Sequence, residues 1–537
     1  MCKKITILAV AVALLLIQCS CRINPDAPED QIINYRTSYE PFTLDPQIAS
    51  DAAARLVIMN IFEGLVRLGM GESIIPGAAE SWDISEDRLE YTFHIRKDAK
   101  WSDGTFLTAD DFLYGLRRTF MPETGSDTAK SLYCIKNAES IQKGIADITT
   151  LGVIADGRDT LIIQLEYPEP DFLQLLTTPP AMPCQEDFFE RAGGQYGRAW
   201  EKLLTNGAFC IKKNGWEHGE YIYLRRNENY NGISRPVPAG IDIEIAADTG
   251  DMCRDIREGS IDCGEIYASE IKTAEETGLS IMATGEIVWG ILFNTESKAL
   301  RNTKLRQGLA AVLDREKLKD CIPYGYSMTG NIIPDSAMIG DTAYRQIVGN
   351  NEIWKIKEAK ELISRGLREE KAERVPEFVI LCPDDEQIQR IASDLIEIWN
   401  GLTNRYINKK TVTISELSER ISEGDYTIAI TPLAVTGTAP LNTLQLFETG
   451  SRNIRALKSA EYDSIIEGIR RNQTIGSLDK IKKAERYLTE EVIFYPLFKG
   501  CRYYCCSEEV KRVIFHSYGG EADFIKAVKR PGGRKNE

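Results

Sequence analysis

The chain has 537 residues, and at roughly 100–200 residues per domain this length predicts three domain-sized units. Its 65 Lys and Arg against 80 Asp and Glu leave a net charge of −15, which disfavours a nucleic-acid binder, because such a protein must neutralise phosphates. Hydrophobic residues at 43% and charged residues at 27% are globular values that exclude bulk disorder, and only three histidines (His94, His218, His516) argue against a His-rich metal site.

The first 20 residues differ from the rest of the chain. Lys3 and Lys4 precede an apolar run from Ile5 to Ile17, which is too short to cross a roughly 30 Å hydrocarbon core comfortably as a permanent helix. This pattern is typical of a secretory signal peptide, so we predict one at residues 1–20 and hence export. A single N-terminal anchor helix is the alternative.

The cysteines that end this segment indicate a lipid anchor. Cys21 follows the small residue Ser20, and we predict that it is lipidated and becomes the new N-terminus. Neither Cys21 nor Cys19 follows a Leu three positions upstream with small residues between, so Cys19 stays an alternative, as does plain cleavage to a soluble secreted protein. Residues 21–30 would form a polar tether, and the basic residues 529–537 a disordered tail.

Strand-like and helix-like segments then alternate irregularly, which predicts α/β units with some antiparallel strands. Leu89–Ile95 alternates as a half-buried strand does, with His94 on the exposed face. Thr108 is a suitable N-cap for a helix that begins with Asp110 and Asp111. Other predicted strands are Gln31–Ser38, Asp159–Glu166, Tyr221–Arg226, Ile241–Ala246, Tyr426–Val435 and Val492–Phe498. Other predicted helices are Ala52–Leu68, Asp251–Glu258, Thr303–Leu313, Glu352–Gly366, Asp385–Trp399 and Leu478–Thr489.

Ten cysteines follow Cys21, in a chain predicted to reach a compartment where disulfides form. Most are expected to be buried as small hydrophobic residues. Cys253 with Cys263, and the cluster of Cys501, Cys505 and Cys506, could each yield a bridge, but spacing alone does not give the pairing.

Motifs of catalysis are missing from the sequence. It contains no phosphate-binding loop, dinucleotide-binding glycine motif, nucleophile elbow or zinc-protease helix. We therefore expect no enzyme, no cofactor and no metal site.

Five sequence blocks between Leu44 and Phe112 recur in a fixed order in one known family. They are LDP (Leu44–Pro46), FEGL (Phe62–Leu65), PGAAESW (Pro76–Trp82), FHIRKDAKWSDG (Phe93–Gly104) and LTADDF (Leu107–Phe112). The sequence resembles the extracellular solute-binding proteins of family 5, the oligopeptide-binding components of ABC importers. Further blocks follow in family order: TNGAF (Thr205–Phe209), LRRNENY (Leu224–Tyr230), REGSIDCGEI (Arg257–Ile266), LFNTESKALRNTKLRQGLAAVLDRE (Leu292–Glu316), GDYTIAI (Gly424–Ile430) and AERYLTEEVIFYPLF (Ala484–Phe498).

The resemblance implies the two-lobed, type II periplasmic-binding-protein fold, an α/β fold with an additional third domain and a ligand cleft between the lobes. Crossing strands join the lobes, which close on the ligand like a hinge. By similarity, lobe I takes residues 31–70, 185–287 and 492–528, the extra domain takes 71–184, and lobe II takes 288–491.

The resemblance also implies where the ligand binds. In peptide-binding relatives the ligand is an extended strand whose main chain pairs with strand edges of the protein. The corresponding edges and an aromatic wall would be Ser38, Tyr39, Glu40, Pro41, Trp289, Ile430, Thr431, Pro432, Leu433 and Ala434. Pro41 and Pro432 lack an N–H, which is compatible with edge positions. The alternatives are that both segments are ordinary strand ends and that Trp289 packs in the core.

One departure from the family pattern concerns the charge of the ligand. Peptide-binding relatives commonly place an Asp just after the lobe-II strand, where its carboxylate pairs with the α-amino group of the peptide. No acidic residue occurs here from Tyr426 to Phe447. A desolvated ammonium without a carboxylate is costly. Either Glu40 or a residue elsewhere supplies the charge, or the ligand is not a peptide with a free N-terminus.

These observations predict a monomeric lipoprotein at the periplasmic or outer face of the cell envelope. It would bind oligopeptides, or a related small solute, and deliver them to the transmembrane subunits of an ABC importer. The alternatives are a receptor for a non-peptide solute and a peptide sensor or chaperone-like holder without a transport role. An exported hydrolase is disfavoured, because no nucleophile–base constellation was found.

Overall fold

The computed structural model describes residues 31–246, 251–313, 315–340, 342–351, 359–433, 437–451, 453–470, 475–517 and 522–530. The predicted signal peptide, the tether, Cys21, Ala434 and residues 531–537 of the predicted tail lie outside these residues. Among the helices described, none combines the length and the apolar character needed to cross a membrane.

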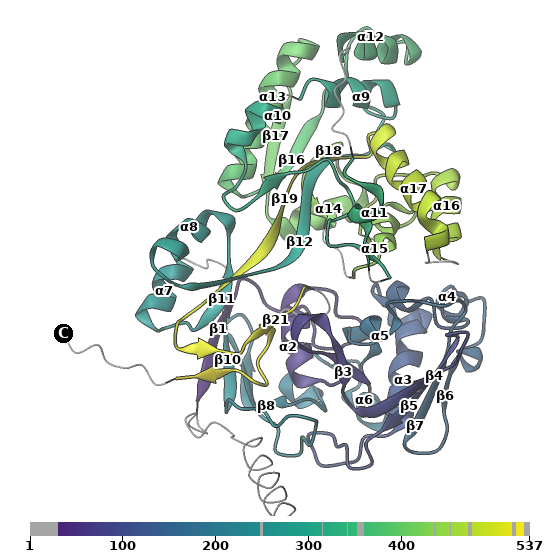
Figure 1. The fold of residues 1–537 in the computed structure, drawn as a ribbon, viewed down its shortest axis with the longest axis vertical. Helices are drawn as coiled ribbons and strands as arrows, with labels where there is room; N and C mark the ends of the chain where they lie inside the picture. The colour runs from purple at the N-terminus through teal and green to yellow at the C-terminus, as the bar shows by residue number, and fades with distance from the viewer. Residues whose placement is uncertain are drawn as a thin grey trace, which may run out of the picture.

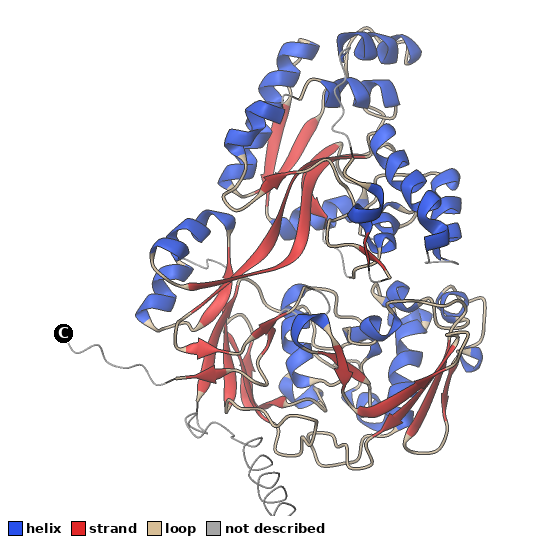
Figure 2. Cartoon of the chain, viewed as in Figure 1, coloured by secondary structure: helices blue, strands red, loops and turns tan. Residues whose placement is uncertain are grey.

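One mixed sheet of eleven strands runs through both halves of the molecule. Its strands are β1 (Ile32–Thr37), β8 (Phe209–Glu217), β9 (Tyr221–Arg226), β10 (Gly240–Ile245), β11 (Cys263–Ile266), β12 (Ser280–Phe293), β13 (Ser327–Met328), β16 (Val379–Pro383), β17 (Asn408–Val412), β18 (Ile428–Leu433) and β19 (Phe494–Cys506). Their order is β17–β16–β18–β12–β19–β11–β1–β10–β9–β8, and β13 also pairs with β19. Figure 1 and Figure 2 show the strands of lobe I in the lower half and those of lobe II in the upper half.

Two long strands, β12 and β19, join the two lobes. They pair antiparallel from Ser280 opposite Cys506 to Leu292 opposite Phe494. At its lobe-I end β19 also pairs with β11, and at its lobe-II end β12 also pairs with β18. The register shifts beside Gly285, whose φ is 56°, so this bulge lies where the strands leave lobe I. The predicted domain boundary at 287/288 falls inside β12.

The extra domain is built on a four-stranded antiparallel sheet in the order β4–β5–β7–β6, with helix α3 nearby. Its Tyr91 and Phe93 are buried, whereas His94 lies on the other face of the strand and bonds to Asp83 (2.9 Å), as the alternation predicts. Thr108 and Asp111 form a capping box at the start of α3. The elements of this region are β2 (Val66–Leu68), β3 (Ile74–Pro76), β4 (Ala79–Ile84), β5 (Glu90–Ile95), β6 (Val153–Ala155), β7 (Thr160–Gln164), α3 (Ala109–Phe120), α4 (Ala138–Gln142) and α5 (Phe172–Leu175).

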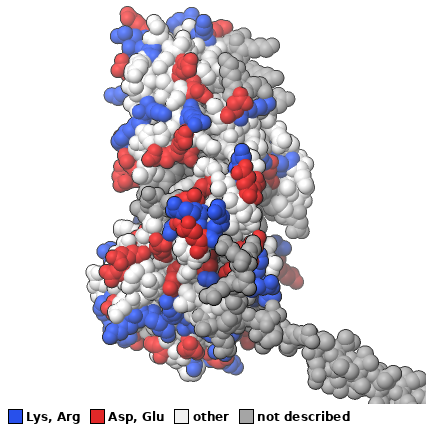
Figure 3. All heavy atoms as spheres, turned by 90° about the vertical axis from the view of Figure 1, so that its left-hand side faces the viewer, with Lys and Arg blue, Asp and Glu red and all other residues white. Residues whose placement is uncertain are grey.

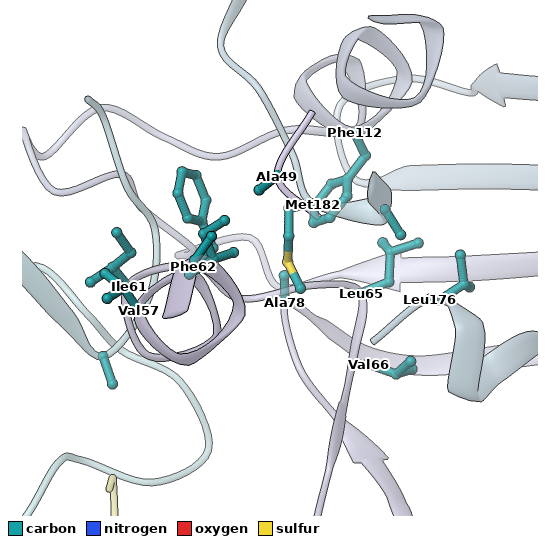
Figure 4. Packing of buried hydrophobic residues seen from close by; sticks show 14 of the residues in the cluster. Ala49, Val57, Ile61, Phe62, Leu65, Val66, Ala78, Phe112, Leu176 and Met182 are labelled. Carbon is teal, nitrogen blue, oxygen red and sulfur yellow. The ribbon is translucent and has the colours of Figure 1, made fainter. Parts of the chain in front are cut away.

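Lobe I and the extra domain share one hydrophobic core. Figure 4 shows part of it: Ile61, the last residue of α2 (Ala52–Ile61), lies with Val57 on one side of Met182, and Phe112 and Leu65 lie on the other. A helix reaching Leu68, as the spacing predicts, is wrong. The chain becomes extended at Phe62, and residues 64–66 then run beside the segment before β4, with Ala78 N bonded to Gly64 O (2.8 Å).

Lobe II packs helices on both faces of its strands and has two core clusters, one on each face. Its helices are α9 (Thr303–Ala311), α10 (Arg315–Leu318), α11 (Tyr344–Val348), α12 (Ala359–Glu369), α13 (Glu386–Thr403), α14 (Ile414–Glu423), α15 (Pro440–Leu444), α16 (Ala460–Arg470) and α17 (Leu478–Glu490). Lobe I adds α6 (Glu186–Ala192), α7 (Met252–Glu258) and α8 (Ala268–Glu276). Short strand pairs are β14 (Met338–Ile339) with β15 (Thr342–Ala343), β20 (Val510–Lys511) with β23 (Val528–Lys529), and β21 (Ile514–Phe515) with β22 (Ala522–Asp523).

Charged side chains of both signs are interspersed over the face of the molecule that Figure 3 turns to the viewer. This face therefore carries its charge as a mixed, solvated surface.

Candidate ligand cleft

The strands β1 and β18 approach the junction between the lobes from opposite sides. β1 is parallel to β11, which is antiparallel to β19, so β1 rises toward lobe II and ends at Thr37. β18 descends toward lobe I, from Ile428 opposite Phe293 to Leu433 opposite Val288. The segments that follow the two strands in the chain therefore begin at this junction.

On the lobe-I side, the carboxylate of Glu40 is held by a turn between β8 and β9. The Nε1–H of Trp216 and the N–H of Gly219 donate to it (3.0 and 3.1 Å), and Nδ1 of His218 lies 2.5 Å from Oε1. The side chain of Glu40 keeps 27% of its exposure. An incoming ammonium would have to compete with these three partners.

On the lobe-II side, β18 presents part of its edge. Its register with β16 covers only Ile428 and Ala429, whereas its register with β12 continues to Leu433. Ile430 and Leu433 point into the core, and Thr431 is also buried. Hence, among the described residues, any ligand contact of this segment would be made by its main chain and by the half-buried Pro432.

Trp289 lies at the end of a row of aromatic rings from β12, β19 and the residue before β13. Its ring is stacked 6.0 Å from Phe498, which lies 5.8 Å from Tyr326, and Tyr326 lies 6.1 Å from Tyr503. Trp289 also borders one of the two lobe-II core clusters. Its ring N–H is buried and makes no hydrogen bond with any described residue.

A charged triad that the sequence analysis missed lies at the junction. Nζ of Lys499 bonds to Asp335 and lies 3.4 Å from Oε1 of Glu286. The N–H of Ser336 donates to the other oxygen of Glu286 (3.0 Å), and Nδ2 of Asn331 donates to Asp335 (2.9 Å). Burial alone would raise the pKa of Asp335, but the bonds from Lys499 and Asn331 hold it below its usual value. Two carboxylates share one ammonium, so the triad carries one negative charge.

The extra domain touches lobe II across the junction. The carboxylate of Asp171, the residue before α5, accepts from the N–H of Ala439 (3.1 Å) and the hydroxyl of Thr438 (3.4 Å). Nζ of Lys130 donates to the carbonyl of Gly450 (3.2 Å). Burial raises the pKa of Asp171 above its usual value. Extra domain and lobe II are therefore in contact in this arrangement of the lobes.

Two other features lie away from the junction. A cavity of about 500 Å³ is walled by residues of lobe II and of the lobe-II end of β19, including Tyr344, Glu485 and Phe494, so it lies at the lobe-II end of the joining strand. Within the described residues, Asp251, Cys253 and Glu270 come close enough to share a metal ion. Asp251 and Glu270 each bond to a main-chain N–H, of Arg254 and Tyr267 (both 2.9 Å), as helix caps do.

Comparisons with known proteins agree with this architecture. The profile of the bacterial extracellular solute-binding proteins, family 5 Middle, matches residues 73–454. The oligopeptide-binding protein OppA of Bacillus subtilis is 27% identical over 480 residues, covering 87% of this chain and 86% of OppA. The probable deoxycholate-binding periplasmic protein YgiS of Escherichia coli is 26% identical over 482 residues, 87% of this chain and 86% of YgiS.

A solved structure extends the agreement to the fold. The substrate-binding domain of an oligopeptide ABC transporter from Bacillus anthracis aligns with a TM-score of 0.83 and 25% identity, over 94% of this chain and 100% of that one. The expected α/β fold of two lobes and a third domain is confirmed. The chain belongs to the bacterial extracellular solute-binding proteins of family 5.

Proposed function

We propose that this chain is the receptor of an ABC importer and that it binds oligopeptides as extended chains between lobes I and II. The observation that carries the proposal is the approach of β1 and β18 to one junction from opposite lobes. A ligand strand there would pair with the main chain of Ser38–Pro41 and of Ile430–Ala434. Because it would bond to both lobes, it would favour their closed arrangement.

The negative triad supplies the counter-charge for the ligand's amino group in this proposal. Glu286 and Asp335 share only Lys499, whereas the carboxylate of Glu40 already has three partners. The main-chain segment after β18 offers no acid up to Phe447. Trp289 would support the apolar part of the ligand from the joining strand.

A co-purified ligand tests the peptide assignment. Mass spectrometry of protein purified without denaturation is expected to release a mixture of short peptides. Recovery of one non-peptide solute would overturn the assignment and favour the second candidate, a receptor for such a solute. That candidate is supported by the name of the relative YgiS and by the missing acid after β18.

Calorimetry tests the place of the counter-charge. N-acetylation of a bound peptide is expected to weaken its binding to the wild type roughly tenfold, and Asp335→Asn is expected to weaken the free-amine peptide to a similar extent. The two changes should not add, because both remove the same interaction. The exposed Asp320→Asn is the matched control. If the two losses of binding free energy are fully additive, the amino group of the peptide binds elsewhere.

We also propose that the mature chain is monomeric and is anchored through lipidated Cys21 at the outer face of the membrane that holds the importer's transmembrane subunits. The sequence pattern at the end of the apolar leader supports this. The Cys21→Ala variant should keep its ligand affinity and move from the membrane fraction to the soluble fraction. If it stays in the membrane fraction, the assignment of the anchor to Cys21 is wrong.

A further inference from the structure

Four cysteines meet at the lobe-I end of the joining strand β19. They are Cys253 in α7, Cys263 in β11, and Cys505 and Cys506 at the end of β19. All four are buried, with exposures of 0–2%, and all are free thiols in the structure. Because neighbouring residues of a strand point to opposite faces, Cys505 and Cys506 lie on opposite sides of the sheet. The core clusters agree: Cys506 shares one cluster with Cys263, and Cys505 shares another with Cys253.

The strand register brings the first pair into a geometry that suits a bond. Cys263 lies directly opposite Cys506 in the antiparallel ladder. The N–H of Ser507 donates to the carbonyl of Asp262 (2.9 Å), so the adjacent Cys263–Cys506 pair is a non-hydrogen-bonded one. In such pairs the Cα atoms are about 4.5 Å apart, within the roughly 4.4–6.8 Å that disulfides span.

The second pair lies where the start of α7 packs on the other face of the sheet. Cys505 lies opposite Gly264. A Cβ added at Gly264 would come within 2.8 Å of Cε of Met252, so the glycine lets this side chain at the start of α7 lie close to the strand. Cys253 is the next residue; it packs with Cys505 in one core cluster, and its thiol donates to the carbonyl of Glu270 (3.9 Å).

We propose that these thiols are two disulfide sites, Cys263–Cys506 and Cys253–Cys505. The two bonds fasten the lobe-I end of β19 to β11 on one face of the sheet and to α7 on the other. They differ from the bridges that spacing suggested, since Cys253 and Cys263 belong to different clusters and the side chains of Cys505 and Cys506 point apart.

Each bond forms by exchange with a disulfide oxidant such as oxidised glutathione. One cysteine loses its proton and its thiolate attacks the oxidant, which expels one glutathione thiolate. The partner cysteine then attacks the mixed disulfide and expels the second glutathione. The two cysteine sulfurs are oxidised, the oxidant is reduced to two thiols, and these take up the two protons.

The bonds form while the chain folds rather than afterwards. Burial raises the pKa of Cys505 to about 12 and that of Cys253 to about 11, so these two thiols hold almost no reactive thiolate in the folded protein, and the burial of all four cysteines keeps an oxidant from reaching them. In the cell, the chain meets such an oxidant only if it is exported, as proposed above. The capacity to form the bonds does not, and it can be measured on the purified chain.

Refolding of the reduced chain in a glutathione redox buffer tests the proposal. After alkylation of the remaining thiols and tryptic digestion, the peptide that carries Cys505 and Cys506 should be joined to the peptides of both Cys253 and Cys263. Alkylation of all four cysteines, exchanged partners, or a bond between Cys505 and Cys506 would overturn it. A chain that binds no peptide but forms both bonds would contradict the proposed function alone.

Single variants assign the partners. Cys505→Ala should free Cys253 for alkylation and leave the Cys263–Cys506 bond, and Cys506→Ala should do the converse. Cys382→Ala, at a buried thiol in lobe II, is the matched control and should keep both bonds. Oxidation should raise the thermal midpoint of the wild type by roughly 5 °C, and it should not change that of the Cys505→Ala/Cys506→Ala variant. If oxidation leaves the wild-type midpoint unchanged, the bonds do not fasten β19.

Discussion

The extra domain makes two joints that are built differently. Toward lobe I, the guanidinium of Arg118 in α3 bonds to both carboxylate oxygens of Asp45 (2.7 and 3.1 Å), and both side chains are at most 5% exposed. The carboxylate of Glu63 accepts from Arg96 (2.9 Å). Toward lobe II, the hydrogen bonds among the described residues include those of Asp171 with the residues before α15 and of Lys130 with the carbonyl of Gly450.

This difference indicates which parts of the molecule move together. Separating a buried ion pair would leave an uncompensated charge, so the first joint favours one rigid unit of lobe I and the extra domain, with its continuous core. The bonds across the second joint can be replaced by bonds to water when the surfaces part. We infer that the extra domain travels with lobe I and meets lobe II only as the cleft closes.

The largest expected effect comes from breaking the joint between the extra domain and lobe I, called the fixed joint below. Arg118→Met leaves the carboxylate of Asp45 buried without its cation, and it removes the guanidinium that lies 3.6 Å from the ring centre of Phe189. We expect the free energy of unfolding, measured by urea denaturation, to fall by about 3–5 kcal/mol.

A matched variant shows whether burial is the cause. Arg301 forms an ion pair with Glu370 in which the arginine side chain is 62% exposed. Arg301→Met should therefore change the free energy of unfolding by less than about 1 kcal/mol. Equal losses for the two variants would refute the distinction between a buried and an exposed ion pair.

The helix that carries Arg118 also makes the free energy of unfolding of lobe I and the extra domain depend on pH. Asp111, the third residue of α3, accepts from the N–H of Thr108 and from Nε1 of Trp101, yet burial, the largest influence, raises its pKa to about 6. Because the folded pKa lies above the unfolded one, the folded state binds more protons between these values. This extra proton stabilises the folded state. The stabilisation is complete below the unfolded pKa of Asp111, near 4, and is lost as the pH rises through its folded pKa of about 6.

We expect this group to lower the free energy of unfolding by up to about 3 kcal/mol between pH 4 and pH 7. Asp111→Asn keeps the acceptor for Thr108 but does not titrate, so the difference between variant and wild type should follow that window in urea titrations at several pH values. The exposed neighbour Asp110→Asn is the control. A difference that does not vary with pH would contradict the assignment to Asp111.

Local patterns allowed much of this unit to be predicted from the sequence. The capping residues Thr108 and Asp111 and the alternation in Leu89–Ile95 act within a few residues, and the structure has both elements. Two of the family blocks meet in the fixed joint, because Asp45 belongs to LDP and Arg118 follows LTADDF on the same helix.

The joining strands and the site were harder to predict. The sequence pattern does not predict β12, because its bulges beside Gly285 and Gly290 interrupt the alternation of apolar residues. The triad of Glu286, Asp335 and Lys499 and the thiol pairs come from segments far apart in the chain. No local spacing signals such contacts, because strand register, which sequence alone does not give, brings them together.

The joint between the extra domain and lobe II is expected to affect ligand binding and not folding. Asp171→Ala leaves the N–H of Ala439 without its acceptor when the lobes are closed. We expect the Kd of a bound peptide, measured by calorimetry, to rise by roughly five- to thirtyfold, which corresponds to about 1–2 kcal/mol. The free energy of unfolding should stay within about 0.5 kcal/mol of the wild type. Asp187→Ala, at an exposed carboxylate of α6, should change neither quantity.

The smallest effect is expected at Lys130, whose Nζ reaches the carbonyl of Gly450 at an exposed part of the same joint. Since water can replace this bond, Lys130→Ala should raise the Kd by about twofold, near the lower limit for one hydrogen bond. The carbonyl carries no net charge, and the lobe-II residues Glu448 and Arg470 act on Lys130 with opposite signs, so the ratio of the two Kd values should change little between 0.05 and 0.5 M salt, in contrast to an ion pair. A tenfold loss, or a ratio that depends strongly on salt, would show that Lys130 is paired with a charge in the closed state and that the joint with lobe II resembles the fixed one.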